Sequence, residues 1–116
     1  MKFKFGVDSF IWAEDFKEKD LWIIEKAKEI GFEVVDFAIA NPYTFPTEQV
    51  KAELARVGMD CVCTTTLTLE TNPISPDGEI RKAAVAAMKK CVDICNTLGA
   101  RSEERRVGKE CRSRWS

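Results

Sequence analysis

Two acidic residues stand inside apolar stretches of the sequence, where a carboxylate needs hydrogen-bond partners or a bound ligand to offset its loss of water. Asp8 ends the stretch that begins at Lys4, and Asp36 lies within the apolar run from Val34 to Ala38. Carboxylates in such positions suit recognition of sugar hydroxyls. Backbone amides of neighbouring loops could satisfy them equally well, and for both residues the two alternatives stay open.

Three further residues extend this candidate site. Trp12 and Phe16 could form an apolar wall against the carbon face of a sugar, or they could pack as core or as a cover over the end of the fold. Thr64 stands with Thr65 and Thr66 at the end of a third β-branched stretch. Ligands of parallel α/β proteins meet the loops beyond the carboxyl ends of the strands, which is where these residues are expected.

Several kinds of chemistry are excluded by what the sequence lacks. The chain contains no His, which excludes a Ser-His-Asp or Cys-His catalytic site and any histidine metal ligand. Neither G-x-G-x-x-G nor G-x-x-x-x-G-K occurs, so nucleotide binding has no support. No residue of the chain is assigned as catalytic or as a metal ligand.

The chain has five cysteines, an odd number, and no secretion signal, which argues against a disulfide framework. Cys61 and Cys63 would share a strand face, and Cys91 and Cys95 would share a helix face, so a four-thiolate zinc site can be drawn. All four lie in periodic apolar segments, where cysteine behaves as a small hydrophobe. Core packing is therefore favoured over metal binding.

The elements that must position these side chains follow a repeating pattern. A strand over residues 4–12, with Asp8 and Trp12 on one face, precedes a helix from an Asp20 N-cap to Ile30. A strand over 32–39 precedes a helix capped by Thr47, and a strand over 59–66 precedes a helix that begins after Asp77 and ends at Leu98. Gly31, Gly58 and Gly99 follow the three helices. Three strands that alternate with three helices predict right-handed crossovers and a parallel sheet.

Composition and charge change at residue 101. The chain has 116 residues, 45% of them hydrophobic, and contains no apolar run of the roughly 20 residues needed to cross a bilayer. Residues 1–100 carry 12 Lys or Arg against 16 Asp or Glu, whereas residues 101–116 carry 6 against 3. Where a fourth strand is expected, this polar tail has a single β-branched residue. We expect residues 1–100 to form one partial domain in a cytoplasmic protein, and residues 101–116 to be read-through material, with a native solvated tail as the alternative.

The residues carry a resemblance to a known family. The segments Gly6–Trp12, Ile30–Asp36, Asn72–Asp77 and Cys91–Ala100, together with Arg81, are similar to the sugar phosphate isomerase/epimerase superfamily of xylose isomerase-like barrels. Within it, the chain most resembles the epimerases that act at C3 of D-tagatose and D-psicose. The N-P-I-S-P-D motif is moderately specific, whereas the G-F-E-V-V-D stretch is shared more widely.

The resemblance implies the first three βα units of an eight-stranded (β/α) TIM barrel. It also implies C3 epimerisation of a ketose through an enediolate, with two Glu residues as acid and base. A divalent metal, Mn, Co or Mg, is held by a Glu, Asp, His, Glu set. Those residues belong to later strands, so this chain alone is expected to bind no metal and to be inactive.

The resemblance also places the candidate site residues in the substrate pocket. Asp8 stands where the epimerases have an aromatic residue, Phe16 lies near a family Trp, Asp36 matches a frequent Glu, and Thr64 replaces a Cys of some members. The exchange at Asp8 departs from the family pattern, and a polar group there favours contact with a hydroxyl and hence a different polyol or keto-sugar. A small-molecule sugar is the expected partner, with no nucleic acid and no membrane, and a full-length enzyme could be a homo-oligomer.

Other interpretations remain. The same early strands occur in hydroxypyruvate isomerase, inosose dehydratase and endonuclease IV-like enzymes, although the acidic balance of residues 1–100 disfavours a DNA enzyme. From a different class, the chain could be a small α/β interaction module whose open sheet edges pair with a partner.

Overall fold

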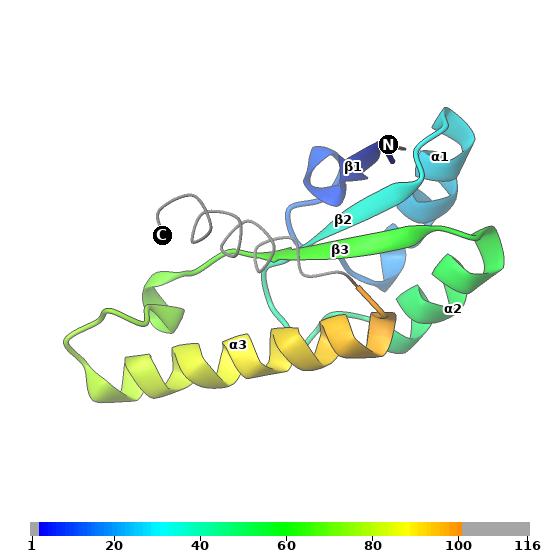
Figure 1. Cartoon of the computed structure of the whole chain (residues 1–116). Helices are drawn as coiled ribbons and strands as arrows, with labels where there is room; N and C mark the ends of the chain where they lie inside the picture. The colour runs from blue at the N-terminus through cyan, green and yellow to red at the C-terminus, as the bar shows by residue number, and fades with distance from the viewer. Residues whose placement is uncertain (1–2, 101–116) are drawn as a thin grey trace, which may run out of the picture.

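The computed structural model describes residues 3–100, and the predicted tail of residues 101–116 lies outside the described part. Three parallel strands form one sheet in the order β1-β2-β3: β1 (Gly6–Asp8), β2 (Val34–Ile39) and β3 (Asp60–Thr65). Three α-helices alternate with them: α1 (Trp22–Ile30), α2 (Thr47–Val57) and α3 (Gly78–Leu98). The predicted parallel α/β arrangement is therefore confirmed (Figure 1).

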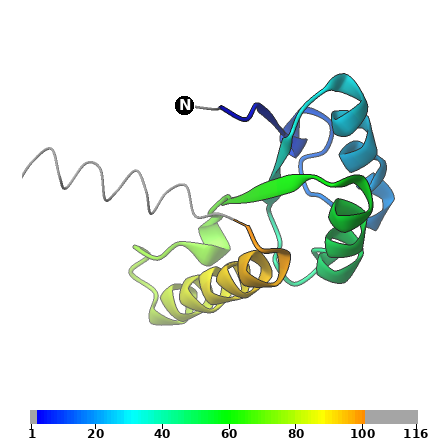
Figure 2. The same ribbon diagram turned by 45° about the vertical axis from the view of Figure 1, so that its right-hand side comes forward.

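All three helices pack on the same side of the sheet, as the two ribbon views show (Figures 1 and 2). The strand residues that face them are buried and belong to one apolar cluster with the helices. Its strand members are Val7, Val35, Phe37, Ile39 and Cys61, and its helix members are Ile23, Ile24, Ala27, Val50, Leu54, Cys91 and Ile94. The opposite face of the sheet is covered by no helix of the described chain, so the sheet has one packed side and one open side.

The first strand is shorter than predicted. Pairing with β2 stops at Asp8, and residues Ser9–Ile11 turn into a 3-10 helix. The Asp8 carboxylate accepts a hydrogen bond of 2.8 Å from the Phe10 amide and caps this turn. Within the described chain, the Ala38 amide of β2 has no strand partner beyond the end of β1. It donates instead to Ser9 Oγ at 3.1 Å. The prediction that Asp8 and Trp12 share a strand face was wrong for this reason.

Helix starts were predicted less well than helix ends. Asp20 does not cap α1, because its carboxylate turns back to the Lys17 amide at 3.0 Å across a short 3-10 helix, Glu18–Asp20. Thr47 is the first residue of α2 and not its cap. Asp77 does cap α3, accepting from the Glu79 amide at 2.9 Å. The three glycines end their helices as predicted, each with a positive φ that L-residues rarely adopt.

The loop before α3 is built by its own side chains. Asn72 Oδ1 accepts from the Ile74 amide at 3.0 Å, and Ser75 Oγ accepts from the Asp77 amide at 3.1 Å. Arg81 reaches back from α3 and donates to the Ser75 carbonyl at 2.7 Å. The N-P-I-S-P-D motif and Arg81 thus hold one turn that leads into the helix.

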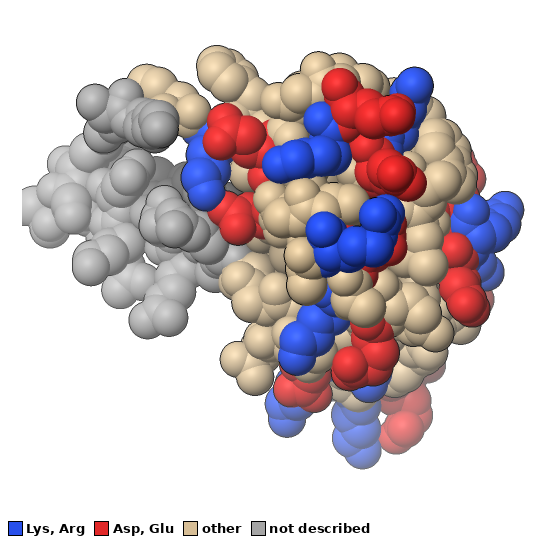
Figure 3. Space-filling view, turned by 90° about the vertical axis from the view of Figure 1, so that its right-hand side faces the viewer, with Lys and Arg blue, Asp and Glu red and all other residues tan. Residues whose placement is uncertain are grey.

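The surface over α1 and α2 carries both signs of charge side by side (Figure 3). Arg56 of α2 pairs with Glu53 and, at 3.5 Å, with Glu25 of α1, which ties the two helices together at the surface. Among the described residues, no helix is long and apolar enough to span a bilayer.

Candidate functional site

Three of the five predicted site residues lie on the open face of the sheet. Side chains alternate along a strand, and Val7, Val35 and Cys61 point to the helices, so their neighbours in sequence point the other way. The register places Asp8 beside Asp36, and Ala38 beside Thr64. Asp8, Asp36 and Thr64 therefore come from three adjacent strands to one surface, with Asp8 and Thr64 near the carboxyl ends of β1 and β3.

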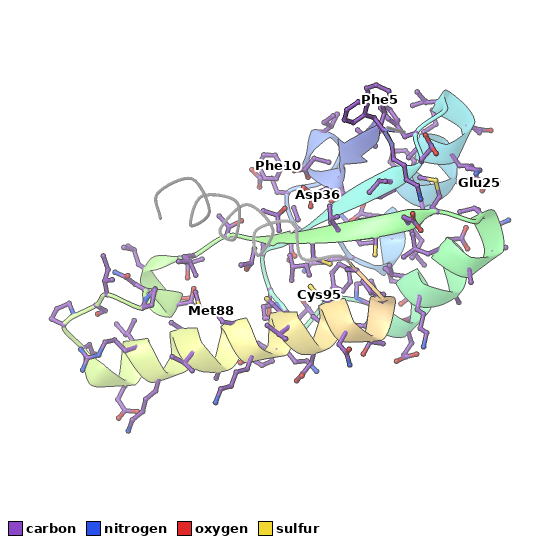
Figure 4. The ribbon with its side chains drawn as sticks, viewed as in Figure 1. Phe5, Phe10, Glu25, Asp36, Met88 and Cys95 are labelled. Carbon is purple, nitrogen blue, oxygen red and sulfur yellow. The ribbon has the colours of Figure 1, made fainter. Side chains whose placement is uncertain are left out.

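Asp36 and Thr64 form the best-defined contact of this surface. Thr64 Oγ1 donates to Asp36 Oδ1 at 2.6 Å across β2 and β3. Burial raises the pKa of Asp36 above its ordinary value of 3.8, the Thr64 hydrogen bond lowers the pKa, and the Asp8 carboxylate raises it; the net direction is upward. In Figure 4, Asp36 lies on the side of the sheet away from α3. The pair offers an acceptor that is partly withdrawn from water, where hydrogen bonds to a ligand are strengthened.

Asp8 has a structural partner in the same chain. Its Oδ1 accepts from the Phe10 amide, so one of the two predicted alternatives, satisfaction by a neighbouring backbone amide, is realised. A carboxylate offers about four acceptor positions, and one such bond leaves capacity for a hydroxyl. The structural role of Asp8 and a ligand contact are thus compatible.

The opposite end of the open face carries a different charge pattern. Lys4 forms an ion pair with Asp60 of β3. In the strand register, Val34 of β2 is level with Gly6 of β1 on one side and with Asp60 of β3 on the other. This ion pair stands at the amino ends of the strands. Asp8 stands at the carboxyl end of β1, where ligands of parallel α/β folds bind, and Asp36 stands beside it in the middle of β2.

The two aromatic candidates lie elsewhere. Phe16 has no exposed surface and packs its ring at 5.0 Å from that of Phe37 and 5.8 Å from that of Phe45. Phe16 therefore takes the position expected of a core residue, one of the two alternatives for this side chain. Trp12 is half-buried, and its ring stands edge-on to that of Trp22 at 6.3 Å. A sugar contact for either residue stays a prediction.

Ser9 is a site residue that sequence reasoning missed. Its hydroxyl is fully buried and holds the Ala38 amide directly after Asp8. Ser9 thereby fixes the bend that ends β1 and keeps Asp8 beside Asp36. A serine next to an acid in an apolar strand was the available signal, because both residue types compete with strand pairing through local hydrogen bonds.

Within residues 3–100, no group of three or more His, Cys, Asp or Glu side chains is placed to hold a metal ion. Asp8 and Asp36 are two carboxylates, each already engaged by one donor, and no third ligand joins them. We assign no metal ligand to these residues.

Comparison with known proteins agrees with this architecture. The sequence pattern of the xylose isomerase-like TIM barrel family matches residues 24–102, which is more than half of the 116 residues. A ketose 3-epimerase of Arthrobacter globiformis is 28% identical over 98 residues, covering 84% of this chain and 34% of the relative. A probable ketose 3-epimerase of Synechocystis sp. is 24% identical over the same length and coverage.

Solved structures show the same fold. The D-allulose 3-epimerase of Methylomonas sp. in complex with D-allulose matches with a TM-score of 0.78 and 19% identity, covering 85% of this chain and 35% of that one. The D-psicose 3-epimerase of Clostridium cellulolyticum H10 with D-tagatose matches with a TM-score of 0.68 and 22% identity, covering 84% and 35%. The chain spans about a third of the length of the curated relatives it matches, namely their N-terminal portion. The chain belongs to the xylose isomerase-like TIM barrel family.

Proposed function

We propose that this chain is the first part of a sugar isomerase or epimerase, and that its open face forms one wall of the sugar site. The observation that carries the proposal is the gathering of Asp8, Asp36 and Thr64 from three adjacent parallel strands on that face. Similarity to ketose 3-epimerases supports a ketose as the substrate class and proton transfer at C3 as the reaction.

The role proposed for the wall is recognition of hydroxyls. Ionised carboxylates accept hydrogen bonds from sugar hydroxyls, and the Thr64 hydroxyl can both donate and accept. Because an Asp stands at position 8, we infer that the sugar presents a hydroxyl there and not an apolar face. Phe16 supports this wall from within the core, since it packs on Phe37, one residue from Asp36.

The catalytic acid and base are proposed to come from strands beyond this chain. A metal dependence is part of the same proposal, with Mn, Co or Mg as the candidate ions, and its ligands are also proposed to lie outside residues 3–100. A metal would supply charge stabilisation of the enediolate in such an enzyme. The 116-residue chain by itself is then expected to turn over no ketose.

A chimeric barrel tests the proposal. Residues 6–100 would replace the matching segment of the Arthrobacter globiformis ketose 3-epimerase, and C3 epimerisation of D-fructose, D-tagatose and D-allulose would be measured with added manganese. We expect a folded, active chimera whose kcat/KM falls about tenfold or more with Asp36→Ala, as for the loss of a hydrogen bond to a charged group of roughly 1.5–3 kcal/mol.

Asp60→Asn is the matched control, because Asp60 lies on the same face at the amino ends of the strands. Its kcat/KM should stay within about a factor of two to three of the unsubstituted chimera, the range of a surface ion pair. A folded chimera in which Asp36→Ala and Asp60→Asn behave alike would contradict the assignment of the wall. Turnover of a ketose by the isolated 116-residue chain would contradict the proposed division of the active site.

A further inference from the structure

Phe10 is a large apolar residue that the fold leaves exposed beside the sugar wall, with an exposed fraction of 57%. The two aromatic residues that the sequence suggested for a sugar contact, Trp12 and Phe16, pack against other rings. Trp12 is half-buried and Phe16 lies in the core. Phe10 was not among the predicted site residues, because nothing in the sequence separates it from the apolar residues around it.

Three hydrogen bonds fix the turn that carries Phe10. The Phe10 amide donates to Asp8 Oδ1 at 2.8 Å, and the Ala38 amide of β2 donates to Ser9 Oγ at 3.1 Å. The Trp12 amide donates to the Ser9 carbonyl at 3.0 Å and closes the turn. The backbone of Phe10 is therefore held to the end of β1, and its amide lies against a carboxylate that belongs to the sugar wall.

The turn lies at the end of the sheet where ligands of parallel α/β folds bind. In Figure 4, Phe10 projects beyond the carboxyl end of β1 and lies, like Asp36, on the side of the sheet away from α3. Phe5 is exposed as well, but it precedes β1 at the amino end of the strands, where its carbonyl accepts from the Glu33 amide at 2.8 Å. Phe10 thus stands at the ligand-binding end of the open face, and Phe5 does not.

A ketose presents both hydroxyls and C–H faces, and Asp8 and Phe10 match these two kinds of surface. A carboxylate accepts hydrogen bonds from hydroxyls. The face of an aromatic ring is negative and attracts the weakly positive C–H hydrogens of a sugar, and ring surface that the sugar covers is removed from water. Because the Asp8 carboxylate lies against the Phe10 backbone, one sugar can meet both residues at neighbouring positions.

We propose that Phe10 contacts the substrate, with its ring packed on a C–H face of the ketose while Asp8 accepts a hydrogen bond from a neighbouring hydroxyl. The inference rests on the proposed function, because it takes the open face as a wall of the sugar site. The ring carries no charge and exchanges no proton, so it makes the same contact with the substrate and with the transition state. Its loss should therefore raise KM and leave kcat nearly unchanged.

The full 116-residue chain provides the first test. D-fructose is titrated into the chain, and the ring signals of Phe10 and Phe5 are followed by NMR after assignment with Phe10→Leu and Phe5→Leu. We expect the Phe10 signals to shift along a saturating curve and the Phe5 signals to stay in place. No shift at Phe10, or equal shifts of the two rings, would overturn the proposal.

The chimeric barrel that carries residues 6–100 tests the same contact by kinetics. Phe10→Ala should raise KM for D-fructose about three- to tenfold, in the range of one aromatic contact, with kcat within about a factor of two. Phe10→Trp keeps a ring face and should restore KM to within about a factor of two of the unsubstituted chimera. Ile30→Ala is the matched control, because Ile30 is 53% exposed at the end of α1, on the helix side of the sheet.

The outcomes separate this inference from the proposed function. If Asp36→Ala lowers kcat/KM while Phe10→Ala and Ile30→Ala leave KM alike, the wall stands and the Phe10 contact is wrong. If Phe10→Ala lowers the free energy of unfolding more than Ile30→Ala does and leaves KM unchanged, the ring is a structural cover and the proposal is again overturned. If Phe10→Ala prevents folding, Phe10→Leu keeps apolar bulk without a ring face; it should raise KM, and an unchanged KM would contradict the contact.

Discussion

Asp36 shows how opposing effects set the chemistry of one residue on the open face. Burial is the largest effect and raises the pKa, Thr64 donates a hydrogen bond that lowers it, and the neighbouring Asp8 carboxylate raises it again. Because the net pKa lies above the ordinary value of 3.8, the folded state holds the Asp36 proton more tightly than the unfolded chain does. The stability that Asp36 contributes is therefore fully present below about pH 3.8 and is lost as the pH rises through the folded pKa.

Replacement of Asp36 by Asn tests this sign. At pH 7 the ionised, partly buried carboxylate opposes folding, so Asp36→Asn should raise the free energy of unfolding measured by urea denaturation. Below the ordinary pKa the carboxyl is neutral in both states, and the gain should disappear. Asp93→Asn, exposed on α3, is the control and should show no comparable gain. A gain that grows towards acid pH would show that the pKa of Asp36 is lowered and not raised.

The candidate site was partly predictable from residue types. Acids in apolar strands drew attention to Asp8 and Asp36, because burial of a carboxylate demands a partner, and the structure brings both together with Thr64. Sequence alone left open what satisfies them. Phe16 could not be assigned, since an aromatic residue in a loop after a strand can face a ligand or the core. Its burial depends on Phe37 and Phe45, which come from later parts of the chain.

At the scale of elements, periodicity predicted the strands and helices that bury a continuous apolar stripe, and it failed where local hydrogen bonds decide. The bounds of β2, β3 and α3 agree with the predicted ranges to within two residues. The helix predicted from an Asp20 N-cap instead begins at Trp22, after the 3-10 turn Glu18–Asp20. The same kind of turn at Ser9 ended β1 early.

The close approach of β1 to β2 depends on Gly6. A Cβ at this position would lie 2.8 Å from the Val34 carbonyl oxygen and 2.9 Å from Val34 Cβ, so the strands would have to separate. Gly6→Ala should lower the free energy of unfolding by about 1–3 kcal/mol, the usual cost of overpacking. Gly78→Ala is the matched control at the start of α3, where the nearest atom to an added Cβ is Arg81 Nη2 at 3.5 Å. It should stabilise the protein by about 0.4–1 kcal/mol in urea unfolding.

The whole molecule presents a sheet that is packed on one side only. In the described residues, β1 and β3 have no strand on their outer edges, and the open face carries the half-buried apolar side chains of Val34 and Val62. Strand edges and apolar faces of this kind associate unless they are paired or covered. In a closed eight-stranded barrel both edges pair and the face lines the interior. We therefore expect the surface that we propose as a sugar wall to drive association of this chain when it is present by itself.

A charge placed on the open face should oppose that association. We expect the 116-residue chain to show an apparent mass that rises with concentration in sedimentation velocity, together with a broad thermal transition. Val62→Lys puts an ammonium in the middle of the open face and should shift the distribution towards monomer. Val92→Lys is the control, because Val92 is 67% exposed on α3 and does not belong to the sheet. If both lysines lowered the apparent mass equally, association would follow net charge and not the open face; a chain that stayed monomeric at every concentration would exclude the open face as a contact surface.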